Sequence, residues 1–433
     1  MNFYSKLLFL SFVIFGFFTC KAQPPKDFDF ENMLQKSLVY TGADNKDAYL
    51  PLLKGKKIGI LTNQTGVVKD IDSQKNYEMR KSDIDNQVEV GDLFEAKIEL
   101  KHLVDFLIEN EVNVQKIYAP EHGFRGTADA GELIKDGKDT KTGLPIISLY
   151  GNNKKPTPEQ LSGIDVMIFD LQDVGARFYT YISSLHYLME ACAENNIPLI
   201  VLDRPNPNGN IVDGPTLEME NKSFVGMHPI PVLHGMTIGE YAKMINGEKW
   251  LNPSTGSGQA VQCDLTVIEC LNYDRNKPYS LPVKPSPNLP NDKSINLYAS
   301  LCFFEGTNVS VGRGTDKQFQ IFGSPFLKNM GFSFTPKPNL GAKAPLHNGK
   351  TCYGKDLSQE KNVEKLELKW LIEAYQNTQD KTKFFNNFFI KLAGTKKLQQ
   401  QIEQRLSETE IRKSWEKDLE AFGKIREKYL IYK

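Results

Sequence analysis

The chain has 433 residues, with 53 basic and 53 acidic side chains and a hydrophobic fraction of 40%. A chain of this length normally forms two domains, and its apolar content is enough to fill two cores. The balanced charge provides no net field to attract nucleic acid or an anionic membrane surface. We therefore expect a small or uncharged partner and no nucleic acid.

The first 22 residues have the pattern of an export signal. Lys6 precedes an apolar run from Leu7 to Phe18, which is shorter than the roughly 20 residues that span a bilayer. Cleavage after Ala22 and acylation of Cys20 as a lipoprotein both fit this pattern, and no second apolar segment of spanning length follows. We expect a mature protein that is periplasmic or held to the envelope by a lipid anchor.

Short apolar strands alternate with helices through the first part of the chain. Strands are predicted over residues 57–63, 114–119, 146–149, 166–169, 199–202 and 264–269, and helices over 93–110, 180–195 and 237–246. This alternation, with short loops rich in Gly and Pro, favours an α/β fold with a Rossmann-like, mostly parallel sheet over residues 30–263. A smaller α+β domain is expected over residues 264–433, with helices over 364–377, 384–393, 397–406 and 408–428.

Polar side chains gather where the predicted strands end. The central strand runs directly into a loop that holds Asp170, Asp173, Arg177, Tyr179 and Tyr181. Loops at the carboxyl ends of strands form the ligand crevice of an open α/β sheet, so this cluster is a candidate site. The structural alternative is that the two aspartates cap the next helix and that the arginine pairs with one of them.

Three further polar loops add candidates, and the carboxylates among them suit glycoside hydrolysis. A glycosidase needs a carboxylic acid that protonates the leaving oxygen and usually a second carboxylate as nucleophile or base. Glu121 is favoured because it follows Pro120 at a strand end and because Gly123 and Gly126 break any helix there. The eligible carboxylates are Glu121, Glu132, Asp170, Asp173 and Glu305.

Several nucleotide and hydrolase signatures are absent from the sequence. It contains no GxGxxG, no Walker lysine loop, no HExxH and no GxSxG. The pair Gly312 and Gly314 around Arg313 is weak evidence for a phosphate site, because the third glycine and a strand-to-helix context are missing. A Rossmann-like sheet therefore hosts a different chemistry here.

Taken together, these loops resemble the bacterial exo-β-N-acetylmuramidase family over essentially the whole mature chain. The motifs that carry the resemblance are GILTNQTG (59–66), APEHGFRG (119–126), TGLPIISLYG (142–151), FDLQDVGARFYTYISSL (169–185), LDRPNPNG (202–209), PSPNLP (285–290), EGTNVSVGRGT (305–315), KLAGT (391–395) and REKYLIY (426–432).

The resemblance implies a Rossmann-like amino-terminal domain, a smaller carboxy-terminal domain and an active cleft between them. It also implies release of terminal β-linked N-acetylmuramic acid from the non-reducing end of peptidoglycan fragments, such as saccharides in which this sugar is linked to N-acetylglucosamine. No metal or organic cofactor is implied. The family's acidic loop residue falls on Glu121, and the charged segment over residues 69–91 departs from the family pattern beside its first motif.

These observations define the expected site and its alternatives. Glu121 is the expected general acid, with a second carboxylate from Asp173, Asp170 or Glu305. A metal-dependent hydrolase that uses His122, Asp170 and Asp173 and a non-catalytic binding protein for cell-wall glycans remain alternatives. The residues expected to bind substrate are Asn63, His122, Arg125, Glu132, Arg177, Tyr179, Tyr181, Asp203, Arg204, Asn308 and Arg313.

Overall fold

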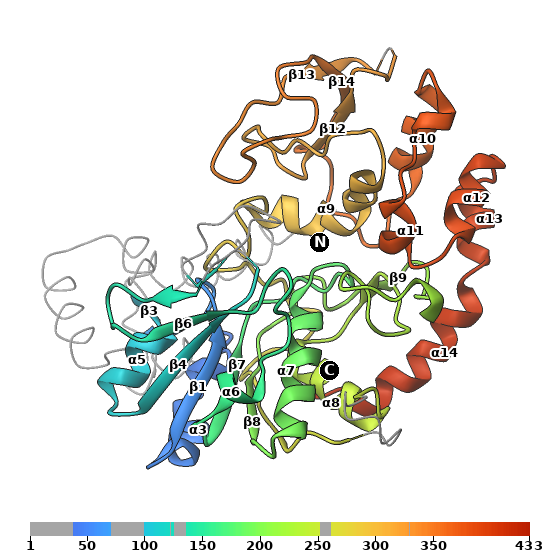
Figure 1. Cartoon of the computed structure of the whole chain (residues 1–433). Coiled ribbons are helices and arrows are strands. Elements are labelled where there is room, and N and C mark those ends of the chain that lie inside the picture. Colours follow the sequence, from blue (N-terminus) through green and yellow to red (C-terminus); the bar gives the residue numbers. More distant parts are fainter. Residues whose placement is uncertain (1–37, 71–98, 122, 125–135, 252–260, 329) are drawn as a thin grey trace, which may run out of the picture. The chain divides into compact units, whose positions relative to one another are not determined.

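The computed structural model describes residues 38–70, 99–121, 123–124, 136–251, 261–328 and 330–433 (Figure 1). The expected export signal with Cys20, and most of the charged segment over residues 69–91, lie outside the described residues. Tyr40–Lys433 form one compact unit. None of the described helices is both long and apolar enough to cross a membrane.

A seven-stranded sheet organises the first part of this unit. The strand order is β11-β8-β7-β1-β4-β6-β5, and all neighbouring strands are parallel except β5, which is antiparallel to β6. This confirms the predicted mostly parallel sheet. The strands are β1 (Lys57–Thr62), β4 (Asn113–Ala119), β5 (Gly137–Lys138), β6 (Pro145–Ser148), β7 (Val166–Asp170), β8 (Leu199–Leu202) and β11 (Leu265–Ile268).

Apolar side chains alternate between the two faces of the sheet, and each face has its own core. Ile58 and Ile60 of β1 join a cluster with α3 (Lys46–Leu53) and α5 (Leu103–Glu109). Leu61 of the same strand and Phe169 of β7 join the larger cluster with α7 (Tyr181–Glu194) and α8 (Ile238–Gly247). The period of two along a strand produces this separation, and Figure 1 shows helices on both sides of the sheet.

Most predicted elements of this region are present, with one change of type. The predicted helix over residues 93–110 begins only at Leu103, because β3 (Glu99–His102) pairs with β2 (Val67–Asp70) as an antiparallel ribbon. The helix predicted over residues 237–246 is present as α8, and Thr237 and Glu240 form a capping box at its start. A short helix, α6 (Pro158–Leu161), precedes β7, and β9 (Val212–Asp213) pairs with β10 (Leu233–His234).

The second half is smaller and mixed. Its strands β12 (Ile321–Ser324), β13 (Phe332–Phe334) and β14 (Cys352–Asp356) form an antiparallel sheet in the order β12-β14-β13. The sequence placed the start of this domain at residue 264, whereas β11 still belongs to the parallel sheet. The helices are α9 (Asp292–Leu301), α10 (Lys369–Asn377), α11 (Phe388–Ala393), α12 (Lys397–Glu403), α13 (Glu408–Lys413) and α14 (Glu416–Arg426).

The helix predicted over residues 408–428 is divided in two. Ser407 and Glu410 form a capping box at the start of α13, but this helix ends at Lys413 and α14 begins at Glu416. Between the two helices, Trp415 turns inward and is only 4% exposed. The backbone leaves the helical conformation at Trp415, where φ is −111° and ψ is 0°.

Arg177 ties the loop after β7 to the second half of the chain. Its side chain is fully buried, and it donates hydrogen bonds of 2.7–2.9 Å to four backbone carbonyls, those of Pro215, Ile230, Leu392 and Ala393. Two of these carbonyls end α11, where a cation also complements the helix dipole. Burial lowers the pKa of Arg177 to about 9, which leaves it charged at neutral pH.

We predict that Arg177→Lys lowers the stability of the folded protein. An ammonium has three N–H donors at one atom and cannot reach four carbonyls as the guanidinium does, so at least one buried carbonyl loses its partner, at about 1–3 kcal/mol. The midpoint of urea unfolding should therefore fall. Arg405→Lys at an exposed position is the matched control and should leave the midpoint unchanged. Equal midpoints for both variants would contradict the anchoring role.

Candidate active site

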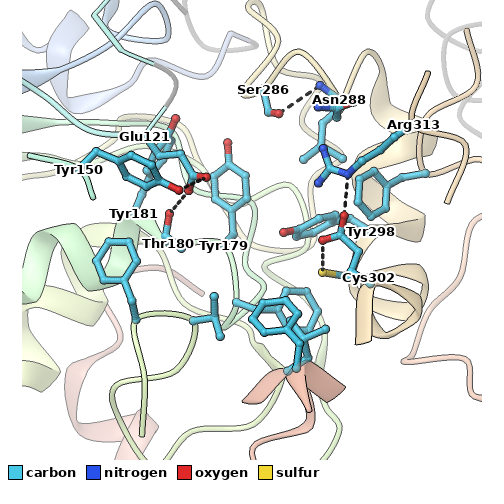
Figure 2. Close-up of a pocket in the computed structure, with 18 residues that line it drawn as sticks. Glu121, Tyr150, Tyr179, Thr180, Tyr181, Ser286, Asn288, Tyr298, Cys302 and Arg313 are labelled. Carbon is cyan, nitrogen blue, oxygen red and sulfur yellow. Dashed lines mark hydrogen bonds and ion pairs between the residues drawn. The ribbon is translucent and has the colours of Figure 1, made fainter. Parts of the chain in front are cut away.

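A cavity of about 250 Å³ lies at the carboxyl ends of the parallel strands and is closed by residues of the second half (Figure 2). Glu121, Tyr150 and Thr180 line it from loops that follow β4, β6 and β7, and Tyr181 lines it from the start of α7. The second half contributes polar groups on the opposite side, together with an apolar wall. These polar and apolar residues are Ser286, Asn288, Leu289, Tyr298, Cys302, Glu305, Arg313, Phe319, Phe388 and Leu392.

The carboxyl group of Glu121 is held from two sides. Tyr150 Oη donates a hydrogen bond of 2.9 Å to Oε1, and Thr180 Oγ1 donates one of 2.8 Å to Oε2. Tyr150 comes close because β6 pairs with β4, with Ala119 opposite Ser148. Thr180 precedes α7, and its hydroxyl makes no capping bond to the helix. These two contacts fix the orientation of Glu121 toward the cavity.

Glu305 is the second carboxylate that lines the cavity. It lies in the 3-10 helix Cys302–Gly306, and its Oε1 is 2.6 Å from Nε of Arg313. Cys302 Sγ is 3.7 Å from the other carboxylate oxygen and forms a long hydrogen bond to it. Burial lowers the pKa of Arg313, but the charge and hydrogen bond of Glu305, together with Tyr298 and Cys302, raise it, and the net direction is upward. Arg313 therefore stays cationic, with its guanidinium 5.1 Å from the centre of the Phe319 ring.

Tyr179 and Tyr181 line the cavity as expected, whereas Asn63 does not line it and contacts Tyr181. Tyr179 donates a hydrogen bond of 2.8 Å to the carbonyl of Pro285, which joins the β7 loop to the second half. Asn63 is fully buried, and its Nδ2 donates to the Tyr181 hydroxyl at 2.6 Å. Burial raises the pKa of Tyr181, and the charge of Glu121 raises it further. Tyr181 therefore remains a neutral phenol beside the carboxylate.

Asp170 and Arg204 form a buried ion pair and do not line the cavity. Arg204 Nε lies 2.6 Å from Oδ1 of Asp170 and Nη2 lies 3.0 Å from Oδ2, in a two-point contact between the ends of β7 and β8. The neighbouring Asp203 accepts hydrogen bonds from Thr237 and Tyr432 and from the backbone of Gly239. Asp170, Asp203 and Arg204 thus stabilise the ends of β7 and β8 and take no part in the lining of the cavity.

Asp173 is also directed away from the cavity. Its Oδ2 accepts a hydrogen bond of 2.7 Å from the backbone N–H of Gly175 and lies 3.6 Å from Nε2 of His234. Of the carboxylates considered as partners for Glu121, only Glu305 therefore lines the cavity. Asn308 and the carbonyl-bound Arg177 do not line it, and His122, Arg125 and Glu132 lie outside the described residues.

Several residues of the site were not among the predicted ones. Tyr150 and Thr180 each follow a predicted strand within motifs that the sequence analysis already quoted, so the strand-end rule could have identified them. Tyr298 and Cys302 lie outside the quoted motifs, and Asn288 lies in one of them but does not follow a predicted strand directly. Their approach to the cavity depends on how the second half packs. Within the part of the chain that the structure describes, no group of three or more His, Cys, Asp or Glu side chains could hold a metal ion.

Comparisons with known proteins show which family the chain resembles. The family model for the N-terminal part of exo-beta-N-acetylmuramidase NamZ matches residues 58–293, and the model for the C-terminal part matches residues 296–432. The chain is 38% identical over 446 aligned residues to the peptidoglycan beta-N-acetylmuramidase NamZ of Bacillus subtilis (strain 168), with 97% of each chain covered.

Two solved structures are also similar, and both are DUF1343 family proteins from Bacteroides fragilis NCTC 9343. The first has a TM-score of 0.77 at 44% identity and covers 92% of this chain and 99% of its own. The second has a TM-score of 0.69 at 28% identity, with 91% and 99% covered. Because the two family models together match most of the chain, the protein belongs to the exo-beta-N-acetylmuramidase NamZ family.

Proposed function

We propose that this protein is an exo-acting glycoside hydrolase that releases terminal non-reducing β-linked N-acetylmuramic acid from peptidoglycan fragments. The observation that carries the proposal is the cavity in which Glu121, held by Tyr150 and Thr180, shares the lining with the Glu305–Arg313 pair. Two carboxyl groups in one cavity are what glycoside hydrolysis requires. The Bacillus subtilis relative, which is named for this activity on peptidoglycan, supports the substrate class.

The size of the cavity supports cleavage at a chain end. Its volume of about 250 Å³ lies slightly below the roughly 300–1,000 Å³ that is typical of small-molecule sites. A space of this size suits one terminal sugar rather than several consecutive sugars of a glycan strand. The saccharide in which N-acetylmuramic acid is linked to N-acetylglucosamine is the minimal substrate that we propose.

The direct test of the proposed function is release of sugar from that disaccharide. The protein should convert the defined disaccharide into free N-acetylmuramic acid and N-acetylglucosamine, which chromatography with mass detection resolves. It should leave the reversed disaccharide, with N-acetylglucosamine at the non-reducing end, intact. Binding of the first disaccharide without release over a long incubation would instead favour a non-catalytic glycan-binding protein.

Glu121 is proposed as the general acid and Glu305 as the second carboxylate. Protonation of a poor leaving group in the transition state typically contributes about 10²- to 10⁴-fold in rate. The hydroxyls of Tyr150 and Thr180 can both donate and accept, so they can hold Glu121 with or without its proton. The ion pair with Arg313 keeps Glu305 in a fixed position on the opposite side of the cavity.

We predict that Glu121→Gln reduces kcat on the disaccharide by at least about 10²-fold, because the amide keeps the shape but has no proton to transfer. The loss should be smaller on an aryl glycoside of N-acetylmuramic acid, whose leaving group needs little protonation. Glu109→Gln, at an exposed position on α5, is the matched control and should retain full activity. Equal losses on both substrates would assign Glu121 the nucleophile or base role, and normal activity on both would remove it from the mechanism.

Arg313 is proposed to recognise the lactyl carboxylate that distinguishes N-acetylmuramic acid from N-acetylglucosamine. Its Nε is engaged by Glu305, and no hydrogen bond from its two terminal nitrogens is found among the described residues. A guanidinium binds a carboxylate through two parallel N–H bonds, which a lysine cannot reproduce. Arg177, the other arginine considered from the sequence, is held by four carbonyls and does not reach the cavity.

We predict that Arg313→Lys lowers the preference for muramic over glucosamine aryl glycosides by about 10-fold or more, measured as the ratio of kcat/KM values. Arg177→Lys is the contrasting variant. It should reduce the amount of folded protein. The protein that does fold should keep the wild-type ratio of kcat/KM values for the muramic and glucosamine glycosides. An unchanged ratio in Arg313→Lys would remove this residue from lactyl recognition.

We further infer that the protein is exported and acts in the periplasm or from a lipid anchor on the envelope. Lys6, the apolar run from Leu7 to Phe18 and Cys20 support this proposal. Mass spectrometry of the amino terminus from cell fractions should find a mature envelope protein that starts near residue 20. A full-length cytoplasmic chain that retains Met1 would contradict it.

A further inference from the structure

Asn288 has a hydrogen-bond acceptor for which the described residues provide no partner. The residue is 1% exposed and lines the cavity, yet its Oδ1 has no hydrogen-bond partner. Buried polar atoms in native proteins are nearly always paired, because a buried acceptor without a donor costs free energy. Because Asn288 is one of the residues that line the cavity, a ligand bound there could supply the missing donor.

The orientation of the Asn288 amide follows from its neighbours. Nδ2 donates a hydrogen bond of 2.6 Å to the carbonyl oxygen of Gly341. If the amide were turned over, two acceptor oxygens would face each other at this distance, so the nitrogen must occupy this position. The free atom is therefore the oxygen, and it requires an N–H or O–H donor.

The backbone around Asn288 is held as firmly as its side chain. Ser286 accepts a hydrogen bond of 3.1 Å from the Asn288 backbone N–H through its hydroxyl, and another of 3.1 Å from Leu289 through its carbonyl. The acceptor is thus fixed before any ligand binds, which reduces the entropy that binding costs.

We propose that Asn288 Oδ1 accepts a hydrogen bond from the acetamido N–H of the terminal sugar and so makes the enzyme selective for 2-acetamido sugars. This inference rests on the proposed function. Figure 2 shows Asn288 and Arg313 on the same side of the cavity, opposite Glu121, Tyr150 and Thr180. In N-acetylmuramic acid the acetamido and lactyl groups are on neighbouring ring carbons, C2 and C3. An acceptor and a guanidinium on one side of the cavity match this pair of substituents.

The apolar lining favours an acetamido group over a hydroxyl as the donor. Leu289, the next residue in the chain, and Phe319 both line the cavity and are 1% exposed. An acetamido group brings a methyl as well as an N–H, so an acceptor beside an apolar wall satisfies both parts of it. A ring hydroxyl has no apolar part to place there.

The test compares two ligands that differ only at the proposed hydrogen bond. The methyl β-thioglycoside of N-acetylmuramic acid resists hydrolysis, and its 2-O-acetyl analogue keeps the carbonyl and the methyl but lacks the N–H. Isothermal titration calorimetry on the wild-type protein should show about 10-fold or tighter binding of the N-acetyl ligand, because the ester leaves Oδ1 unpaired. In Asn288→Ala the two dissociation constants should agree within about 3-fold.

Controls separate this proposal from folding defects. Asn195→Ala removes a side-chain amide that bonds the Ala191 carbonyl at the far end of α7 and should keep the wild-type ratio of dissociation constants. Asn288→Ser provides a second variant with a smaller polar side chain, and it should also lose the discrimination. If neither Asn288 variant folds, equal binding of the two ligands by the wild-type protein would still overturn the proposal.

The outcomes also separate this proposal from the proposed function. If the wild-type protein cleaves the disaccharide but binds both thioglycosides equally, the role of Asn288 is wrong and the function stands. The role is equally wrong if Asn288→Ala still binds the N-acetyl ligand more tightly than the 2-O-acetyl ligand. It is also wrong if the loss of affinity that depends on Asn288 appears with a 4-deoxy ligand and not with the 2-O-acetyl ligand. If the wild-type protein neither cleaves the disaccharide nor binds either ligand, the proposed function itself fails.

Discussion

The candidate active site depends on one carboxyl group, that of Glu121, which is held between two hydroxyls. Glu121 follows β4, and its partners Tyr150 and Thr180 follow β6 and β7. Parallel strands place their carboxyl ends at the same edge of a sheet, so three loops that are distant in sequence meet there. The sheet thus brings the two hydroxyls within hydrogen-bond distance of the Glu121 carboxyl group and orients it.

Other charged side chains at the same edge of the sheet do not line the cavity and instead hold neighbouring elements together. The buried pair of Asp170 and Arg204 joins the ends of β7 and β8, and Arg177 connects the β7 loop to the end of α11. A substitution at Gly394, which ends that helix at φ 74°, would bring a Cβ within 2.7 Å of the Arg177 guanidinium. The contacts of Arg177 with the end of α11 connect the two halves of the chain beside the cavity.

The sequence was sufficient to predict the sheet but only part of the site. Strand-end reasoning identified Glu121 because Pro120 and the following glycines leave no helical explanation for it. It could not separate Asp170 from Glu305, because pairing of Asp170 with Arg204 depends on the strand order, which periodicity does not reveal. α9 was missed although Asn291 and Ser294 form a capping box at its start. Asn288 lies in the motif PSPNLP (285–290), but the sequence did not single it out, since its significance lies in a hydrogen bond that is not made.

The central claim is that this cavity binds a terminal N-acetylmuramic acid with its glycosidic oxygen beside Glu121. A crystal structure of Glu121→Gln with the intact disaccharide tests it most directly, because this variant keeps the shape of the site while cleavage is slow. We predict that the muramic ring occupies the cavity, with the glycosidic oxygen within hydrogen-bond distance of Gln at position 121 and the lactyl carboxylate on Arg313. A disaccharide bound elsewhere on the protein, with this cavity empty, would contradict the account.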